Sequence, residues 1–376
     1  MKITILHGAF FPVPALRGGA IGKAWDALGQ SFSSKGHEVT HVSRKYDGLP
    51  EEEQNGNVRH LRVGGFNSVN NALLLKIKEF LYVFRAQKVL PKADLLVTHA
   101  FWAPLLLPKV KFGKIYVHVG RYPKGQLKYY KKACCFQVPT KAIGAAVKEE
   151  IASSRQKISV LPYPLNWKAD SESDYLKRDL KIFYLGRIHP EKGVAELIQA
   201  FKLVPTDIRN NWKLSIRGPW QTGQGGGGKK FINQLRKMIS ESSACIELLD
   251  PVFSESELNK ELKTARIFAY PSLAEKGETF GLSVLEAMSC GCIPIVSALE
   301  CFKDLVENNK SGYVFDHKSK HRDDSLKSVL SKAMQSENHN ITMSEECLIK
   351  AKNFELEEVS ASYLDDFSKL LSVKDY

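Results

Sequence analysis

Short apolar runs alternate with longer amphipathic stretches along the whole chain. The runs predict strands, and the stretches in which apolar residues recur every three or four positions predict helices. Strands are expected at 2–6, 38–43, 94–98, 114–119, 134–138, 157–161, 181–186, 213–217, 245–249, 267–271, 293–297 and 312–315. Helices are expected, among other places, at 20–35, 72–88, 140–151, 191–203, 229–240, 254–263 and 282–290.

This alternation predicts an α/β protein with parallel sheets covered by helices on both faces. Because twelve strands would make a large single sheet, two sheets of about six are expected. A polar, charged segment at 166–180 precedes a fresh strand, and the interdomain linker is expected there. The predicted domains are 1–165 and 178–356, and the tail at 343–371 has the pattern of one or two amphipathic helices.

The charge distribution separates the two halves of the 376-residue chain. The net charge is +13, but residues 1–166 hold 25 Lys and Arg against 10 Asp and Glu, whereas the remainder holds 29 against 31. The first half therefore carries the whole surplus. Such a half is suited to phosphorylated substrates, nucleic acid or a membrane surface.

Several protein classes are excluded by composition. Hydrophobic residues make up 43% and charged residues 25%, which is ordinary for a globular protein and unlike a disordered or collagenous chain. The seven cysteines form no Cys-x-x-Cys pair, so reduced thiols in a cytoplasmic protein are expected. The first residues are too weakly apolar for a signal peptide, and no window approaches a membrane span of about 20 apolar residues.

The segment 278–297 carries the strongest candidate chemistry. Glu278 and Glu286 are eight positions apart, with Gly281 between them and a predicted helix beginning at Leu282. Free N–H groups at a helix N-terminus can bind a diphosphate, and a carboxylate can accept hydrogen bonds from sugar hydroxyls. The alternative is that both glutamates are ordinary surface charges.

A second candidate segment, 181–193, ends a predicted strand at Gly186 and continues with Arg187 and Lys192 before a helix. Ligands of such sheets bind beyond the carboxyl ends of the strands. Two cations there can neutralise a diphosphate, although a solvated arginine and a helix-start lysine are the alternative.

Together, 181–193 and 278–297 resemble the retaining glycosyltransferases of family 4 (glycosyl transferases group 1), which have the GT-B architecture. The likeness extends to 35–40 and 309–314, so it spans most of the chain. It implies two Rossmann-like parallel-sheet domains facing across a cleft. The N-terminal domain would hold the acceptor and be completed by a returning helix at about 357–376, and the C-terminal domain would bind a nucleotide sugar.

The resemblance also implies roles for individual residues. Arg187 and Lys192 would bind the donor diphosphate, Glu278 would contact the transferred sugar, and Glu286 would hold the ribose hydroxyls. The further donor-binding positions are Gly19 and Gly186 near the phosphates, the backbone of Phe280, Gly281 and Leu282, and Val252 in the segment 251–253 near the base.

His118 is the remaining catalytic candidate. It lies at the end of the predicted strand 114–119, where the family often has a functional histidine that would contact the sugar. His99 competes for this place, and a packed core histidine is the alternative. The acidic residue that often follows this histidine is replaced here by Gly120 and Arg121, so its orientation by a carboxylate is open.

Two further features bear on the donor site. In Arg217–Gln221, where relatives usually carry a Gly-x-Gly turn, Trp220 either narrows the donor pocket or packs under the glycine-rich loop 223–228. The sequence has no complete phosphate-binding P-loop and no Asp-x-Asp pair for a divalent metal. We therefore expect a metal-independent enzyme with no cofactor besides its nucleotide-sugar co-substrate.

The expected function is transfer of a hexose, with retention, from a nucleotide diphosphate sugar to a glycan, glycolipid or glycoprotein. GDP-mannose is favoured over UDP-glucose as the donor. Alternatives are a sugar-nucleotide epimerase of the same fold, a basic nucleic-acid-binding protein and an inactive glycosyltransferase-like scaffold.

The basic half adds a hypothesis about partners. Between Asp94 and Glu149 the sequence has ten Lys and Arg and no acidic residue. This face either binds an anionic acceptor or anionic lipid, or it is a solvated lysine-rich surface. Peripheral membrane contact and the oligomeric state stay open at this point.

Overall fold

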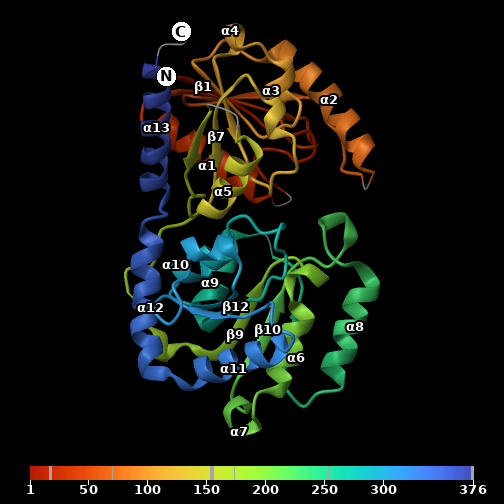
Figure 1. Cartoon of the computed structure of the whole chain (residues 1–376), viewed down its shortest axis with the longest axis vertical. Coiled ribbons are helices and arrows are strands. Elements are labelled where there is room, and N and C mark those ends of the chain that lie inside the picture. Colours follow the sequence, from red (N-terminus) through yellow and green to blue (C-terminus); the bar gives the residue numbers. More distant parts are fainter. Residues whose placement is uncertain (17–18, 70, 153–155, 173, 253, 374–376) are drawn as a thin grey trace. The chain divides into compact units, whose positions relative to one another are not determined.

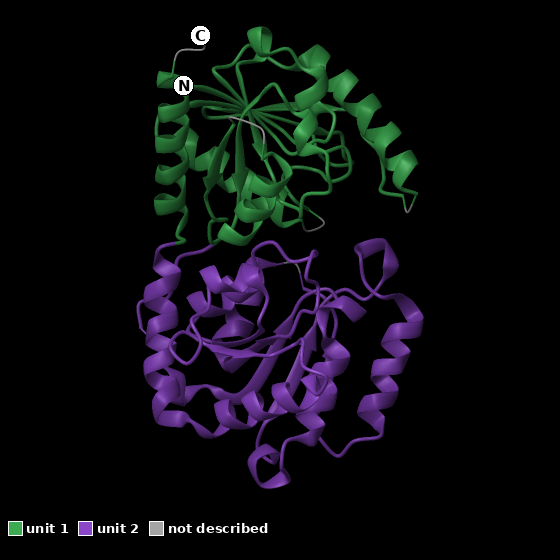
Figure 2. Cartoon of the chain, in the orientation of Figure 1, with its two compact units in different colours: residues 1–166, 354–376 green, residues 167–353 purple. Residues whose placement is uncertain are grey.

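The computed structural model describes residues 1–16, 19–69, 71–152, 156–172, 174–252 and 254–373. The chain divides into two compact units (Figure 2). Unit 1 comprises Met1–Asn166 and Phe354–Tyr376, and unit 2 comprises Trp167–Asn353. Each unit contains a mainly parallel sheet with helices on both faces, which confirms the predicted α/β fold (Figure 1).

The elements of unit 1 follow the predicted alternation closely. Its strands are β1 (Lys2–Leu6), β2 (Glu38–Arg44), β3 (Glu52–Asn55), β4 (Val58–Val63), β5 (Leu95–Thr98), β6 (Lys114–His118), β7 (Ala133–Val138) and β8 (Lys157–Val160). Its helices are α1 (Ala20–Ser34), α2 (Ala72–Val89), α3 (Ala103–Leu106), α4 (Lys109–Phe112), η1 (Leu127–Tyr129), α5 (Lys141–Glu150) and α13 (Leu356–Ser372).

The sheet of unit 1 is larger than the six strands expected. Its order in the described residues is β3-β4-β2-β1-β5-β6-β7-β8, parallel except for the antiparallel pair β3–β4. The sequence analysis missed β3 and β4. The four residues of β3 are polar and exposed at the sheet edge, and β4 mixes two arginines and a histidine with apolar residues, so neither has the apolar run of a buried strand.

The C-terminal helix α13 completes unit 1, as the resemblance implied (Figure 2). Val359, Tyr363 and Phe367 lie in one core cluster with Trp25 and Phe32 of α1. Three polar side chains of the sheet also converge on a buried carboxylate of this helix: the Tyr116 hydroxyl (2.9 Å), the Ser159 hydroxyl (3.0 Å) and the Lys157 ammonium all contact Asp366. Both apolar and polar contacts therefore hold α13 on the sheet.

Unit 2 contains the elements that carry the predicted donor residues. Its strands are β9 (Asp179–Leu185), β10 (Lys213–Arg217), β11 (Ile246–Leu249), β12 (Ala265–Tyr270), β13 (Ile293–Ser297) and β14 (Tyr313–Phe315). Its α-helices are α6 (Val194–Leu203), α7 (Thr206–Arg209), α8 (Gly228–Ser240), α9 (Glu255–Thr264), α10 (Leu282–Ser289), α11 (Arg322–Gln335) and α12 (Glu337–Lys352). Short 3₁₀ turns are η2 (Tyr175–Lys177), η3 (Pro190–Lys192), η4 (Thr222–Gln224) and η5 (Glu300–Asp304).

The strands of unit 2 are all parallel in the order β11-β10-β9-β12-β13-β14, with β9 and β12 at the centre. All six residues of β12 and all five of β13 are buried, as expected for strands covered on both faces. Because the strands are parallel, their carboxyl ends meet at one edge of the sheet.

The segment expected to be a linker belongs largely to unit 2. The Trp167 indole N–H donates to the Ser289 hydroxyl (2.9 Å), and the backbone N–H of Asp170 donates to the Ser289 carbonyl (2.9 Å). Two hydrogen bonds to the end of α10 therefore hold this polar segment on unit 2, although its composition predicts a linker. At the other boundary, Phe354 accepts a backbone hydrogen bond from Leu165 and lies in unit 1.

Candidate active site

The predicted donor-binding residues of unit 2 lie at the carboxyl edge of its sheet. Gly186 and Arg187 directly follow β9, and Val252 follows β11 after a short connection. Helix α10 connects the parallel strands β12 and β13, so its N-terminus lies at the same edge. This is the edge at which open parallel sheets bind their ligands. Phe253, part of the segment expected near the base, lies outside the described residues.

Lys192 and Glu278 form a buried ion pair at this edge. The Lys192 ammonium contacts Glu278 Oε1, and the two residues are only 4% and 8% exposed. The same carboxylate oxygen accepts from the Tyr270 hydroxyl (3.0 Å) and the Ser272 hydroxyl (3.3 Å). Burial, followed by the charge of Glu278, raises the pKa of Tyr270 well above its ordinary value, so this hydroxyl stays a donor. The two charges are therefore held in fixed positions, by each other and by two hydroxyl groups, in a place that little water reaches.

Backbone geometry places Lys192 in this cluster. Lys192 ends the turn η3, and Gly193 follows it in the left-handed conformation (φ 69°) and caps α6. A β-carbon on Gly193 would lie 2.0 Å from the Pro271 carbonyl oxygen. Only glycine therefore allows the chain to turn this closely against the end of β12, and the turn directs Lys192 inward.

Arg187 has different partners from those of Lys192. Its guanidinium donates to Glu191 Oε1 (3.0 Å) and to the Gly225 carbonyl (2.8 Å), and its side chain is 43% exposed. The pair with Glu191 is thus a solvent-screened contact. An anion reaching this edge could exchange with Glu191 for one face of the guanidinium at small cost.

The start of α10 has the geometry of an anion-binding helix terminus. Gly281 caps the helix in the left-handed conformation (φ 94°), and a β-carbon there would lie 2.6 Å from Phe302 Cε1. Phe280 is buried, Leu282 is half-buried, and Glu286 is 9% exposed one turn into the helix. The first N–H groups of a helix have no partner within it, so this end presents donors and a positive dipole.

The glycine-rich loop is folded back onto Trp220. The N–H groups of Gly226, Gly227 and Gly228 donate to the carbonyls of Gln221, Ile188 and Trp220. A β-carbon on Gly226 would lie 2.2 Å from the Trp220 carbonyl carbon. These contacts use the backbone of Trp220, which supports the loop that in turn holds Arg187, and the indole takes no part in them.

His118 is buried at the end of β6 in unit 1, and both of its ring nitrogens are hydrogen-bonded. The Gln137 amide donates to the Leu161 carbonyl (2.7 Å), so its oxygen faces His118 Nδ1 and accepts the proton there. His118 Nε2 then accepts from the Tyr163 hydroxyl (2.9 Å). An amide, not a carboxylate, therefore orients this histidine. Burial lowers its pKa to about 4, which keeps the ring neutral.

The alternative candidate His99 binds a backbone group of unit 1. Its Nε2 accepts the backbone N–H of Gly8 (3.1 Å), and burial lowers its pKa to about 3. Gly19 caps α1 with φ 115° and is exposed, with open space around the position of a β-carbon. The structure thus places Gly19 and His118 in unit 1 and the other predicted residues in unit 2.

Sequence reasoning missed Tyr270 and Ser272, which contact the ion pair, and Glu191, which contacts Arg187. Tyr270 and Ser272 end the predicted strand 267–271 or directly follow it, and this position at the carboxyl end could have identified them. Glu191 lies inside the motif 181–193, but its pairing with Arg187 depends on the turn η3. No motif pattern reports such a pairing.

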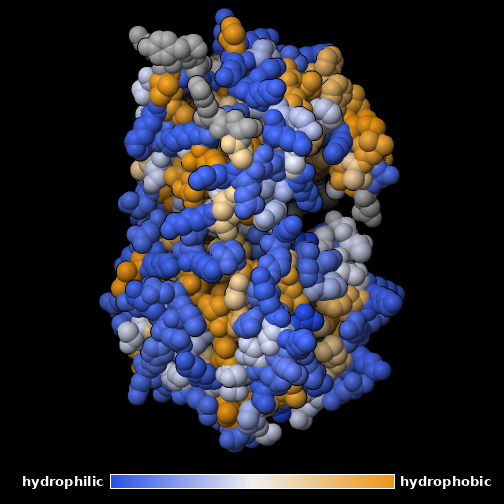
Figure 3. Space-filling model, in the orientation of Figure 1, coloured by the Kyte–Doolittle hydropathy of each residue, from blue (hydrophilic) through white to orange (hydrophobic). Residues whose placement is uncertain are grey.

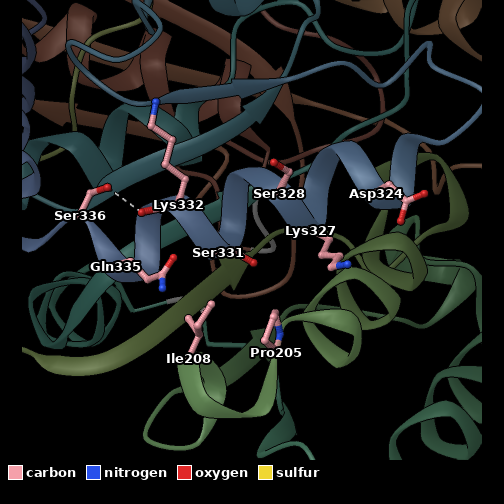
Figure 4. Close-up of a pocket in the computed structure, with 9 residues that line it drawn as sticks. All are labelled: Pro205, Ile208, Asp324, Lys327, Ser328, Ser331, Lys332, Gln335 and Ser336. Atoms are coloured by element: carbon pink, nitrogen blue, oxygen red, sulfur yellow. Dashed lines mark hydrogen bonds between the residues drawn. The ribbon is translucent and has the colours of Figure 1, made fainter.

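The described residues also form hollows away from the predicted site. One of about 490 Å³ lies between α7 and α11 of unit 2, where Ile208 and Pro205 face Ser331 and Lys327 (Figure 4). Another of about 470 Å³ in unit 1 is lined by polar residues that include Arg44 and Lys45. Neither hollow is lined by a predicted site residue. The candidate site is therefore recognised by its charged side chains and its glycine turns.

Comparisons with known proteins bear on the family and the fold. Residues 167–347 match the family model for glycosyl transferases group 1. The chain is 31% identical to O-antigen chain mannosyltransferase B of Escherichia coli over 121 residues, 30% of this chain and 27% of the relative. It is 24% identical to the serotype-specific mannosyltransferase WbdA of Escherichia coli over 230 residues, 61% of this chain and 26% of the relative. These matches thus span about a quarter of each relative's length.

Structural similarity extends over both units. Sucrose-phosphate synthase from Thermosynechococcus elongatus superposes with a TM-score of 0.81 at 17% identity, covering 99% of this chain and all of that one. The fold is therefore GT-B, as predicted. Unit 2 is thus the part of the chain that is similar in sequence to the group 1 glycosyltransferases.

Proposed function

We propose that this protein transfers a hexose from a nucleotide diphosphate sugar to a glycan acceptor with retention of configuration. The observation that carries the proposal is the buried Lys192–Glu278 pair at the carboxyl edge of the unit 2 sheet. Burying a charge pair costs desolvation free energy, and such pairs in a ligand-binding position are typical of functional sites. Here Lys192 can stabilise the negative charge that develops on a diphosphate leaving group.

In the proposed mechanism Lys192 and Arg187 bind the diphosphate, and the N–H groups at the start of α10 add further donors. Glu278 then lies beside the transferred sugar, where its negative charge stabilises the oxocarbenium-like centre as the bond to the diphosphate breaks. The acceptor hydroxyl attacks from the face that the leaving group vacates, and its proton passes to the departing phosphate. No covalent nucleophile is assigned.

Mannose is the sugar we favour, with GDP-mannose preferred over UDP-glucose as the donor. The support is that two relatives are named mannosyltransferases, one of them acting on an O-antigen chain. A growing glycan chain is accordingly the acceptor class we propose.

Calorimetric titration with GDP-mannose, UDP-glucose and their free nucleotides tests the donor. We expect GDP-mannose to bind at least tenfold more tightly than UDP-glucose, and NMR of the product to show the anomeric configuration of the donor. Tighter binding of UDP-glucose would overturn the mannose assignment. Release of free nucleotide with an altered sugar and no transfer would instead identify an epimerase.

The variant Glu278→Gln tests the site itself. Glutamine keeps an oxygen for the Tyr270 and Ser272 hydroxyls but removes the charge. We expect transfer to fall by at least a hundredfold with donor affinity nearly unchanged, because the charge acts mainly in the transition state. Glu191→Gln, which removes a carboxylate outside the buried cluster, is the matched control and should cost less than tenfold. Equal rates in both variants would refute the proposed role of Glu278.

A further inference from the structure

Helix α2 of unit 1 exposes an unusual amount of apolar surface. Leu73, Ile77, Phe80 and Phe84 are 69%, 48%, 38% and 54% exposed. These positions are spaced by four, three and four residues, so they form one stripe along the outer face of the helix. We call this set the α2 stripe. Figure 3 shows hydrophobic residues gathered where Figure 1 places α2.

The opposite face of α2 already serves the core. Tyr82, Val83 and Ala86 are buried in a core cluster of unit 1. Folding of unit 1 therefore leaves the α2 stripe uncovered. Isolated exposed apolar residues are ordinary, but a contiguous stripe on one helix marks an interaction surface.

Cations flank the α2 stripe on both sides. Around the helix, Lys76 lies on one side of the stripe, and Arg85 and Lys88 lie on the other. The Lys88 ammonium is 5.4 Å from the centre of the Phe84 ring, so charge and apolar surface are in direct contact. The acidic residue of the helix, Glu79, accepts the backbone N–H of Phe101 (3.2 Å) and is half-buried.

The chain that follows α2 continues the same composition. Residues 72–132 hold thirteen Lys and Arg and two Asp and Glu. On α4, Val110 is fully exposed between Lys109 and Lys111. Trp102, whose ring is 5.5 Å from that of Phe80, adds an aromatic side chain beside the stripe. Apolar residues interleaved with lysine, with an aromatic ring beside them, are typical of a surface that rests at the boundary of a lipid layer.

We propose that α2 lies in the plane of an anionic membrane surface, with the α2 stripe inserted among the acyl chains and the flanking cations at the head groups. Charge complementarity selects this occupant. A second copy of the chain would bring equal positive charges together, and the same repulsion disfavours any basic partner. Among the described residues no helix is long and apolar enough to cross a membrane, so the contact is peripheral.

The proposal goes beyond the donor chemistry and does not depend on it. The hypothesis of lipid contact is drawn from the basic sequence between 94 and 149, and the proposal places this contact on α2 instead. That segment supplies charge, but charge alone is equally consistent with a solvated surface. The apolar stripe that distinguishes a lipid surface lies on α2, before that segment begins.

Sedimentation of the full chain with vesicles tests the proposal. We compare phosphatidylcholine alone with phosphatidylcholine mixed with phosphatidylglycerol, at low and high salt. Binding should require the anionic lipid and weaken as salt rises. Ile77→Ser with Phe84→Ser should weaken binding at least tenfold, because apolar area no longer enters the lipid. Lys76→Gln with Lys88→Gln should weaken vesicle binding about 25-fold, because each lost cation should weaken it about fivefold.

The matched control is Leu203→Ser with Ile349→Ser, which changes two exposed apolar residues of unit 2 and should leave vesicle binding unchanged. Circular dichroism and donor titration of every variant check that the fold and the donor site remain. Equal binding to neutral vesicles, or unchanged binding by the stripe variant, would overturn the proposal. Light scattering that shows a dimer lost in the stripe variant would also overturn it, in favour of a second copy on this face.

Discussion

Unit 1 and unit 2 have the same architecture but place their polar groups differently. In unit 2 the buried side chains of Lys192 and Glu278 carry opposite charges and form an ion pair, and both residues follow the central strands β9 and β12. Unit 1 instead buries a group of four histidines, His7, His41, His60 and His118, of which His7 and His41 are hydrogen-bonded to each other (2.9 Å). The difference shows that the same fold can bury an ion pair in one unit and a group of uncharged histidines in the other.

The largest expected effect comes from breaking the charge pair of unit 2. Lys192→Ala leaves Glu278 buried without its cation, which should lower the free energy of unfolding by about 3–5 kcal/mol and abolish transfer. Lys192→Met combined with Glu278→Gln removes both charges and should restore more than half of the lost stability without restoring transfer. Urea unfolding and a transfer assay measure the two properties. A double variant as unstable as the single one would show that charge pairing is not the cause.

Acid should weaken unit 1 through its histidines. Burial lowers the pKa of His41 and His99 to about 3 and that of His118 to about 4, below the unfolded value of 6.5. The unfolded chain therefore binds protons that the folded chain does not. Each histidine removes up to about 1.4 kcal/mol of stability per pH unit as the pH falls below 6.5. Asp26, whose pKa burial raises to about 6, offsets part of this loss.

Hydrogen exchange measured at pH 7.5 and at pH 5 reports the acid sensitivity of each unit separately. Protection should fall at the lower pH in β1, β2 and β5 of unit 1 and change less in β9 and β12 of unit 2. The variant His41→Asn should make unit 1 less sensitive to acid. Equal loss of protection in both units would contradict a histidine-based cause.

A smaller effect is expected at the orienting amide of unit 1. Gln137→Leu leaves the His118 Nδ1–H and the Leu161 carbonyl without their partner, which should cost about 1–3 kcal/mol of unfolding free energy. Gln137→Glu can still accept the proton and should raise the pH at which His118 titrates. NMR titration of the imidazole measures that shift. An unchanged titration in the glutamate variant would mean that Gln137 does not control the proton position.

The smallest expected effect is that of metal removal. If the cations at the edge of unit 2 neutralise the diphosphate, treatment with EDTA should change the transfer rate by less than twofold. Arg187→Met, by comparison, should lower it at least tenfold, since one cation is lost. A rate that disappears with EDTA and returns with Mg²⁺ would replace the metal-independent prediction.

Much of the fold followed from local pattern. The period of apolar residues predicts α1, α2 and α6 and the buried strands β9, β12 and β13 nearly to their ends. The strands β3 and β4 could not be predicted, because β3 is polar on both faces and β4 places His60 and Arg62 in buried positions. Their polar residues are accommodated by neighbours distant in sequence, and local pattern does not register those neighbours.

The candidate site divides in the same way. Motif spacing identifies Lys192, Glu278 and Gly281, since a turn, a cation and a helix start are local features. It does not reveal that Lys192 pairs with Glu278, because 86 residues separate them and only the adjacent ends of β9 and β12 bring them together.

The sequence by itself determined the periodic elements, the parallel-sheet class, the charge division at residue 166 and the motifs at the strand ends, because each depends on neighbours along the chain. Only the tertiary structure decided which groups are buried together. It paired the charges of the candidate site, gave His118 an amide as its orienting partner, and left one helix face of unit 1 uncovered. These outcomes depend on burial and on contacts between distant segments, and burial is what makes a charge costly, a histidine neutral or an exposed leucine available for binding.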